Sequence, residues 1–340
     1  MGEITRGRKR FPELSQHAFE HPLDRSALLA LQKMPGLDWV IRKFLTTIGE
    51  RRLRLLFLAS SVRANDAQFA RLRGLLEEAS AILGMEETPD LFVSKKFALN
   101  AAAIGVDRPF IVITSSLVEM MDDEELQCVL WHELGHILSG HSLYTTMLVV
   151  LLRMWHFFLG VPGGIYAVIA ISLSLLEWRR KAELSADRAG LLVSQDPNIS
   201  YRVDMKLAGG RRADEMDLDS FMAQAEEYEA GGDLLDGVLK LALIARETHP
   251  FPVLRVAELR KWVESGEYER ILQGDYPRHG DDEADSWLES VKRTADAYRE
   301  SFEDSQDPFV STLRDLSGGA AATGAEVLEF IRRAMGMRDR

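Results

Sequence analysis

The sequence predicts an α+β protein that is mostly helical and has one small antiparallel or mixed sheet. Apolar residues recur with a helical period over much of the chain, including an amphipathic stretch at about 68–83. Three short apolar segments, 91–93, 97–103 and 110–114, are separated by turn-prone residues and predict strands. Residues 131–136 then read Trp-His-Glu-Leu-Gly-His, which contains the pattern HExxH and predicts a helix just after the sheet.

The N-terminal segment, residues 1–64, is expected to be helical and to carry no secretory signal. Basic residues gather at positions 6–10, as at the start of a signal peptide, but positions 11–24 contain glutamates and histidines in place of an apolar stretch. The segments 28–45 and 52–58 are too short or too charged to span a bilayer. We therefore expect a cytoplasmic protein.

The helix that carries HExxH has signals at both of its ends. Asp122 and Glu125 are three residues apart and predict a capping box, and the acidic residues around them suit the positive end of the helix dipole. Gly140 predicts the end of the helix. Gly135 lowers helix stability by about 1 kcal/mol relative to alanine. We therefore expect another element to approach the helix closely at Gly135.

The HExxH residues have the chemistry and the spacing of a metal site. His132 and His136 project from one face of a helix about one turn apart, so that both imidazoles can bind one metal ion. Glu133 lies beside them and can act on a metal-bound water. Downstream, Glu183 can supply a third ligand, and Asp187 can accept a hydrogen bond from a ligand histidine. Alone, two acids at this spacing usually form only a solvated helix face, so their assignment depends on the upstream motif.

Four segments of the chain, in this order, resemble the HtpX/Ste24/Oma1-like zinc metallopeptidases (peptidase family M48). They are 97–103, similar to the family's Asn-Ala-x-Ala strand; 132–136 with its acidic helix start; 183–187 followed by Arg188; and 248–250 with Arg255 beyond it. The resemblance covers about residues 65–260. It implies a gluzincin-type fold and the hydrolysis of peptide bonds.

The resemblance also implies roles for residues outside HExxH. An edge strand would run along the active-site cleft and pair with the substrate backbone, although a plain buried strand is the alternative. The strand residues concerned are Asn100, Ala101, Ala102 and Ala103. His249 would lie near the zinc and stabilise an oxyanion, or else serve as a turn residue before Pro250. Arg255 would hold the site together by pairing with an acidic residue.

The segment 143–176 is apolar and contains one ionised side chain, that of Arg153. A glycine-rich break at 160–164 predicts two apolar helices joined by a turn. Because His136 and Glu183 must meet at one metal ion, the chain has to return to the side that it left. Two crossings of a membrane need about 20 residues each, more than this segment offers. We expect a hairpin buried in the protein, with a shallow contact to a membrane surface as the alternative.

These inferences predict a zinc-dependent metalloendopeptidase that acts on peptide or protein substrates. Its catalytic domain would span 65–275, between the helical segment 1–64 and an acidic C-terminal extension, 276–340. One Zn²⁺ per chain would be held by His132, His136 and Glu183, and Glu133 would act as general base on a zinc-activated water. The alternative is a catalytically silent scaffold or a membrane-associated adaptor, which would have no use for a general base.

Composition agrees with this interpretation. The net charge of −12 argues against a nucleic-acid partner, which needs a clustered basic surface. The single cysteine, Cys128, lies one helical turn before His132, and a small buried core residue is a simpler role for it than a metal ligand. The oligomeric state does not follow from the sequence.

Overall fold

The computed structural model describes residues 8–32, 37, 49–95, 100–154, 164–230 and 251–278. The helices in these ranges are α1 (Pro22–Gln32), α3 (Gly49–Ser60), α4 (Ala70–Ile82), α5 (Ser115–Met120), α6 (Asp123–Leu138), α7 (His141–Met154), α8 (Gly164–Ser194), α9 (Pro197–Gly209), α10 (Leu218–Ala230), α12 (Pro252–Glu264) and α13 (Glu267–Leu272), with the short 3-10 helices η1 (Gln16–Ala18) and η3 (Ala213–Glu215). Together with one small mixed sheet, they confirm the predicted mostly helical fold with a small sheet.

The sheet has the strand order β1-β2-β4-β3. Its strands are β1 (Val62–Arg63), β2 (Leu91–Ser94), β3 (Ala101–Ile104) and β4 (Phe110–Thr114). The central strands β2 and β4 are parallel and fully buried, whereas β1 and β3 run antiparallel to their neighbours. The sequence did not predict β1, because its two residues are both exposed and belong to no apolar run. β3 lies at one edge of the sheet, as expected, and the described part of the predicted segment 97–103 begins at Asn100.

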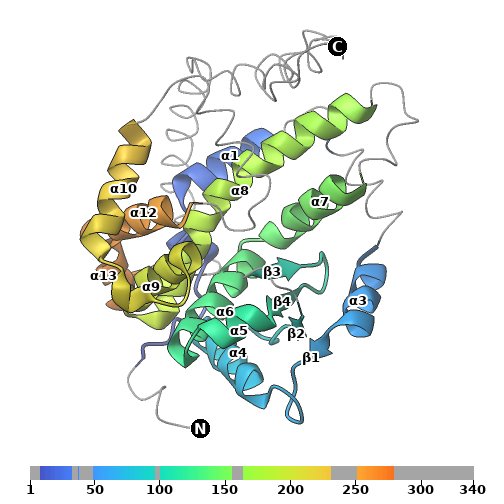
Figure 1. Cartoon of the computed structure of the whole chain (residues 1–340), viewed down its shortest axis with the longest axis horizontal. Coiled ribbons are helices and arrows are strands. Elements are labelled where there is room, and N and C mark those ends of the chain that lie inside the picture. Colours follow the sequence, from blue (N-terminus) through green and yellow to red (C-terminus); the bar gives the residue numbers. More distant parts are fainter. Residues whose placement is uncertain are drawn as a thin grey trace.

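Helices α6 and α8 pack closely against each other and position the residues of the candidate site (Figure 1). A Cβ atom at Gly135 of α6 would lie 2.6 Å from the Cβ of Ala189 and 3.3 Å from the Cα of Ala186, both in α8. The close approach expected at this glycine is therefore confirmed. The short distance between the two helices brings the HExxH side chains within reach of α8.

The predicted ends of the HExxH helix are also confirmed. The Asp122 carboxylate accepts a hydrogen bond from the Glu125 backbone N–H at 2.9 Å, and the Glu125 carboxylate accepts one from the Asp122 N–H at 3.0 Å, which forms the capping box. At the other end, Gly140 adopts φ = +69°, and its N–H donates to the Ile137 carbonyl at 3.0 Å. Glycine suits this left-handed position because it has no Cβ.

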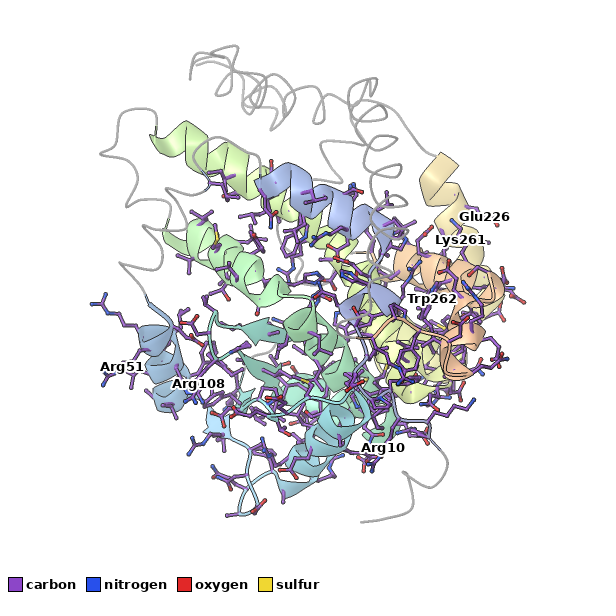
Figure 2. All side chains as sticks on the ribbon, turned by 180° about the vertical axis from the view of Figure 1, so that it is seen from behind. Arg10, Arg51, Arg108, Glu226, Lys261 and Trp262 are labelled. Carbon is purple, nitrogen blue, oxygen red and sulfur yellow. The ribbon has the colours of Figure 1, made fainter. Side chains whose placement is uncertain are left out.

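The remaining helices surround this central pair. α4 contacts one side of α6, and α9 contacts α6, α8 and α12. α1 lies along α8, so the N-terminal region contributes directly to the core (Figure 1). Seen from behind, Arg51 on α3 and Glu226 on α10 point outward on opposite sides of the molecule (Figure 2). The division into 1–64, 65–275 and 276–340 stays a prediction.

The described parts of the apolar segment 143–176 belong to two helices, α7 and α8, as predicted. Apolar residues of both helices, including Leu148 and Leu175, form a buried cluster with Leu28 of α1. Among the described residues, no single helix is long and apolar enough to cross a membrane; only the pair Asp123–Leu138 and His141–Leu151, bent by 96°, meets those criteria jointly.

Candidate metal centre

The structure brings together the three residues that the sequence proposed as metal ligands. His132 and His136 come from α6 and Glu183 comes from α8, and all three side chains are buried. The Nε2 atom of His132 lies 3.3 Å from Oε2 of Glu183, and Nε2 of His136 lies 3.6 Å from Oε1. One ligand atom from each residue lies within 4.8 Å of the others. This cluster is able to bind a metal ion.

The ring of His132 is oriented by a carboxylate and a guanidinium group. Its Nδ1 atom lies 2.9 Å from Oδ1 of Asp187, one helical turn after Glu183. Arg255 of α12 donates to both oxygens of Asp187, with 2.7 Å between Nε and Oδ2. Arg255 therefore pairs with an acidic residue, and it also lies 3.8 Å from Glu183. Because its Nδ1 atom is held in this way, the ring of His132 presents its other nitrogen, Nε2, to the metal position.

The carboxylates of Asp187 and Glu183, both on α8, favour a positive charge at the ring of His132. Burial alone would lower the pKa of His132, but its contacts with Asp187 and Glu183 raise the pKa to about 10. Burial lowers the pKa of His136 to about 4. Burial opposes ionisation of Asp187, yet the charge of Arg255 and the hydrogen bonds lower its pKa to about 2. Because a metal ion binds neutral imidazole, it would take the place of the proton on His132.

Glu133 lies on the wall of a pocket beside the cluster. The pocket is also lined by His132 and Asp187, and by Asn100 and Ala101 at the start of the edge strand. The Glu133 carboxyl group is buried, with 1% of the residue exposed. The predicted general base and the first residues of the predicted substrate strand therefore share one pocket.

The other two residues of the predicted substrate strand lie further along β3. Ala102 is paired in register with Val112, and the buried Ala103 is paired with Ile111 of β4. His249 lies outside the described residues, so its predicted place near the metal stays a prediction.

Cys128 is a buried core residue, 6% exposed, as expected, and it also lines the pocket. Burial raises the pKa of its thiol to about 12.

Sequence reasoning missed two residues at this centre. The Nδ1 atom of His141, the first residue of α7, lies 3.0 Å from Nδ1 of His136. On its other side, Nε2 of His141 lies 3.0 Å from Oδ2 of Asp24 in α1. A third histidine shortly after HExxH was a usable signal. No spacing rule points to Asp24, because it is more than 100 residues away in the chain.

The comparisons with known proteins agree on one family. A sequence model of peptidase family M48 matches residues 66–263, more than half of the chain. The plastoglobule-localized metallopeptidase 48, chloroplastic, of Arabidopsis thaliana is 38% identical over 269 residues, which are 77% of this chain and 77% of that protein. A protease HtpX homologue of Thermoanaerobacter pseudethanolicus is 27% identical over 169 residues, 40% of this chain and 56% of that protein.

A second HtpX homologue, from Polynucleobacter necessarius, is 23% identical over 269 residues, 72% of this chain and 89% of that protein. No solved structure matches the chain. The matched region includes the whole candidate metal cluster, and these relatives are named as proteases or metallopeptidases. Family and structure together indicate a metal-dependent protease: the chain belongs to peptidase family M48.

Proposed function

We propose that this protein is a zinc-dependent metalloendopeptidase of the gluzincin type, with one zinc ion held by His132, His136 and Glu183. The observation that supports the proposal is the buried convergence of these three side chains from two helices. Two imidazole nitrogens and one carboxylate are a common donor set of catalytic zinc sites, which keep a fourth position open. The donor set therefore fits zinc.

Bound zinc would lower the pKa of a coordinated water and polarise the scissile carbonyl group. Glu133 follows His132 directly in α6 and would accept the proton of the attacking water, then donate it to the leaving amine. Asp187 would keep the proton of His132 on Nδ1, which leaves the lone pair of Nε2 for the metal. Arg255 would hold Asp187 ionised and in place.

We further propose that a peptide or protein substrate binds along β3. The strand lies at the edge of the sheet, where an extended peptide can be added through main-chain hydrogen bonds. Its alanine side chains leave room for the substrate. The Asn100 carbonyl accepts a hydrogen bond from the Thr114 backbone N–H at 2.9 Å, and the Asn100 N–H donates to Oγ1 of Thr114 at 3.1 Å. The buried Oδ1 atom of Asn100 has no hydrogen-bond partner among the described residues. Such an atom can bind a group of the substrate.

The test is a comparison of Glu133→Gln with the matched variant Glu124→Gln. Glu124 lies in the first turn of the same helix but is exposed. Zinc content is measured by elemental analysis, and activity by cleavage of casein. We expect Glu133→Gln to keep one zinc per chain and to lose activity by about three orders of magnitude or more. Glu124→Gln should resemble the wild type in both measurements.

Two results would contradict the proposal. Casein cleavage by Glu133→Gln at the wild-type rate would show that Glu133 is not the base. A wild-type protein that binds zinc but cleaves no peptide bond would favour the catalytically silent scaffold. A predicted role of His249 in stabilising the oxyanion can be tested in the same assay, since His249→Ala should lower kcat and leave the zinc content unchanged.

A further inference from the structure

The second histidine of HExxH has a support that differs from that of the first. Nδ1 of His136 lies 3.0 Å from Nδ1 of His141, and Nε2 of His141 lies 3.0 Å from Oδ2 of Asp24. His141 and Asp24 are both fully buried, at 0% exposure. The three side chains thus form a continuous polar chain inside the protein, running from the metal cluster to α1.

Asp24, at the end of this polar chain of side chains, is fixed to α8, the helix that carries Glu183. Asp24 Oδ1 accepts a hydrogen bond from Nε1 of Trp178 at 3.0 Å, and Oδ2 accepts one from Oγ of Ser185 at 2.6 Å. Trp178 and Ser185 both belong to α8. In turn, Ser185 accepts a hydrogen bond from the backbone N–H of His21, just before α1. Asp24 therefore has a fixed position relative to Glu183.

Proton counting determines the direction of each bond. Both atoms of the contact between the two histidines are Nδ1, so one of them carries a hydrogen and the other does not. If Nε2 of His136 binds the metal, the hydrogen of the neutral ring is on Nδ1, and His141 must accept it there. The hydrogen of neutral His141 is then on Nε2, the nitrogen that lies 3.0 Å from Oδ2 of Asp24. No net charge on either ring is required.

The opposite direction would exclude a metal ion at one end and bring two acceptors together at the other. It would put the hydrogen of His136 on Nε2, where it blocks the metal position. It would also turn the lone pair of His141 Nε2 toward the carboxylate of Asp24 at 3.0 Å, where two acceptors would repel each other. An ionised Asp24 therefore selects the tautomer of His136 that can bind a metal ion.

We propose that Asp24 and His141 are positioning residues for the metal centre, which set the tautomer and the orientation of His136. The inference rests on the proposed function of His136 as a ligand. It also means that α1, which precedes the region 66–263 matched by the family model, completes the metal centre. His132 depends on Asp187 and Arg255, whereas His136 depends on a second histidine and an acid from the N-terminal region.

The decisive variant is Asp24→Asn, which keeps the size of the side chain. When the amide oxygen accepts from Trp178, the amide N–H₂ group faces Nε2 of His141, which must then accept a hydrogen bond. The hydrogen of His141 moves to Nδ1, and that of His136 moves to Nε2, in competition with the metal. We expect zinc affinity, measured by competition with a chelator, to fall about 10–100-fold. The absorption spectrum of the Co²⁺-substituted protein should change as well.

Two control variants separate this effect from a loss of stability. Leu28→Ala removes a buried apolar side chain from the same helix α1 without touching the polar chain, and should lower Tm while keeping zinc affinity. His141→Asn keeps an acceptor for the Nδ1–H of His136, and should therefore lose less zinc affinity than Asp24→Asn. Wild-type zinc affinity and Co²⁺ spectrum in Asp24→Asn would overturn the proposal.

A measurement on the wild-type protein needs neither a variant nor bound zinc. Nitrogen-15 NMR of the histidine rings in the metal-free protein should show hydrogen on Nδ1 of His136 and on Nε2 of His141. Hydrogen on Nδ1 of His141 would overturn the proposal even if the enzyme binds zinc. If the protein shows the expected tautomers but does not bind zinc, the result would support the effect of Asp24 and His141 on the tautomer of His136. The same result would contradict the proposed function.

Discussion

The contact between α6 and α8 at Gly135 allows a quantitative test of how the metal cluster is assembled. A Cβ added to Gly135 would lie 2.6 Å from the Cβ of Ala189, which is 0.8 Å short of the 3.4 Å at which ordinary contact begins. Both atoms are attached directly to helical backbone, so no change of rotamer can relieve the clash. In Gly135→Ala, the two helices must therefore move apart.

Two opposing terms decide the effect on stability. Replacing glycine by alanine within a helix favours folding by about 1 kcal/mol. Overfilling a packed interior typically costs about 1–3 kcal/mol, and a clash between two backbone-attached carbons belongs at the upper end. We expect a net loss of about 2 kcal/mol, or a fall in Tm of about 4–8 °C for a domain of this size. Zinc affinity should fall at least about tenfold, because ligand distances tolerate only about 0.2 Å.

Gly190 provides a matched control on the same interface. A Cβ at Gly190 of α8 would lie 3.5 Å from the Cys128 carbonyl oxygen and 3.7 Å from the backbone nitrogen of His132, both ordinary contacts. Gly190→Ala should therefore raise Tm by about 2–4 °C and leave zinc affinity unchanged. Calorimetry and chelator competition measure both quantities.

A compensating pair of substitutions completes the test. Ala189→Gly removes the atom that clashes, so the double variant Gly135→Ala with Ala189→Gly should recover most of the zinc affinity. The reasoning is refuted if Gly135→Ala is as stable as the wild type and binds zinc equally well. It is also refuted if Gly190→Ala is the more damaging of the two single substitutions.

Three further predictions concern the ligands, the cysteine and the apolar segment. Glu183→Ala should lower both zinc occupancy and Tm, whereas Asp187→Ala should cost about 10–100-fold in zinc affinity; full zinc occupancy in Glu183→Ala would mean that another residue completes the site. Cys128, with its pKa raised to about 12 by burial, should be a thiolate in only about 10⁻⁴ of molecules at pH 8 and should resist iodoacetamide until the protein is unfolded. Rapid labelling of the native protein would contradict that pKa. Because 143–176 is too short for two crossings, alkaline carbonate should release the protein from membranes; release by detergent alone would show insertion.

The parts of the fold that could be predicted are those with strong local signals. The capping box at Asp122, the glycine after α6 and the buried strands β2 and β4 each depend on residues close together in sequence. The sequence also predicts helices over about 218–230 and 253–264, and α10 and α12 occupy these positions. A third helix is predicted at about 234–246, a segment that lies outside the described residues.

Long-range contacts could not be predicted in the same way. β1 is a strand because β2 offers it a free edge, and its two exposed residues carry no pattern of their own. The sequence presents the apolar segment that ends at Leu176 and the acidic residue Glu183 as separate features. The structure shows that both belong to α8, one helix of 31 residues. The position of Asp24 depends on how α1 lies along α8. No local periodicity contains that information.

Each histidine of the cluster depends on α8 in more than one way. His132 is supported by Asp187, which is itself a residue of α8, and His136 is supported through Asp24, which is hydrogen-bonded to two side chains of α8. Glu183, the third member of the cluster, belongs to the same helix. A shift of α8 along α6 would therefore disturb the distance between the ligand atoms and the support of both imidazoles at once. For this reason we expect a substitution that forces α6 and α8 apart, such as Gly135→Ala, to weaken metal binding more than its effect on stability alone would suggest.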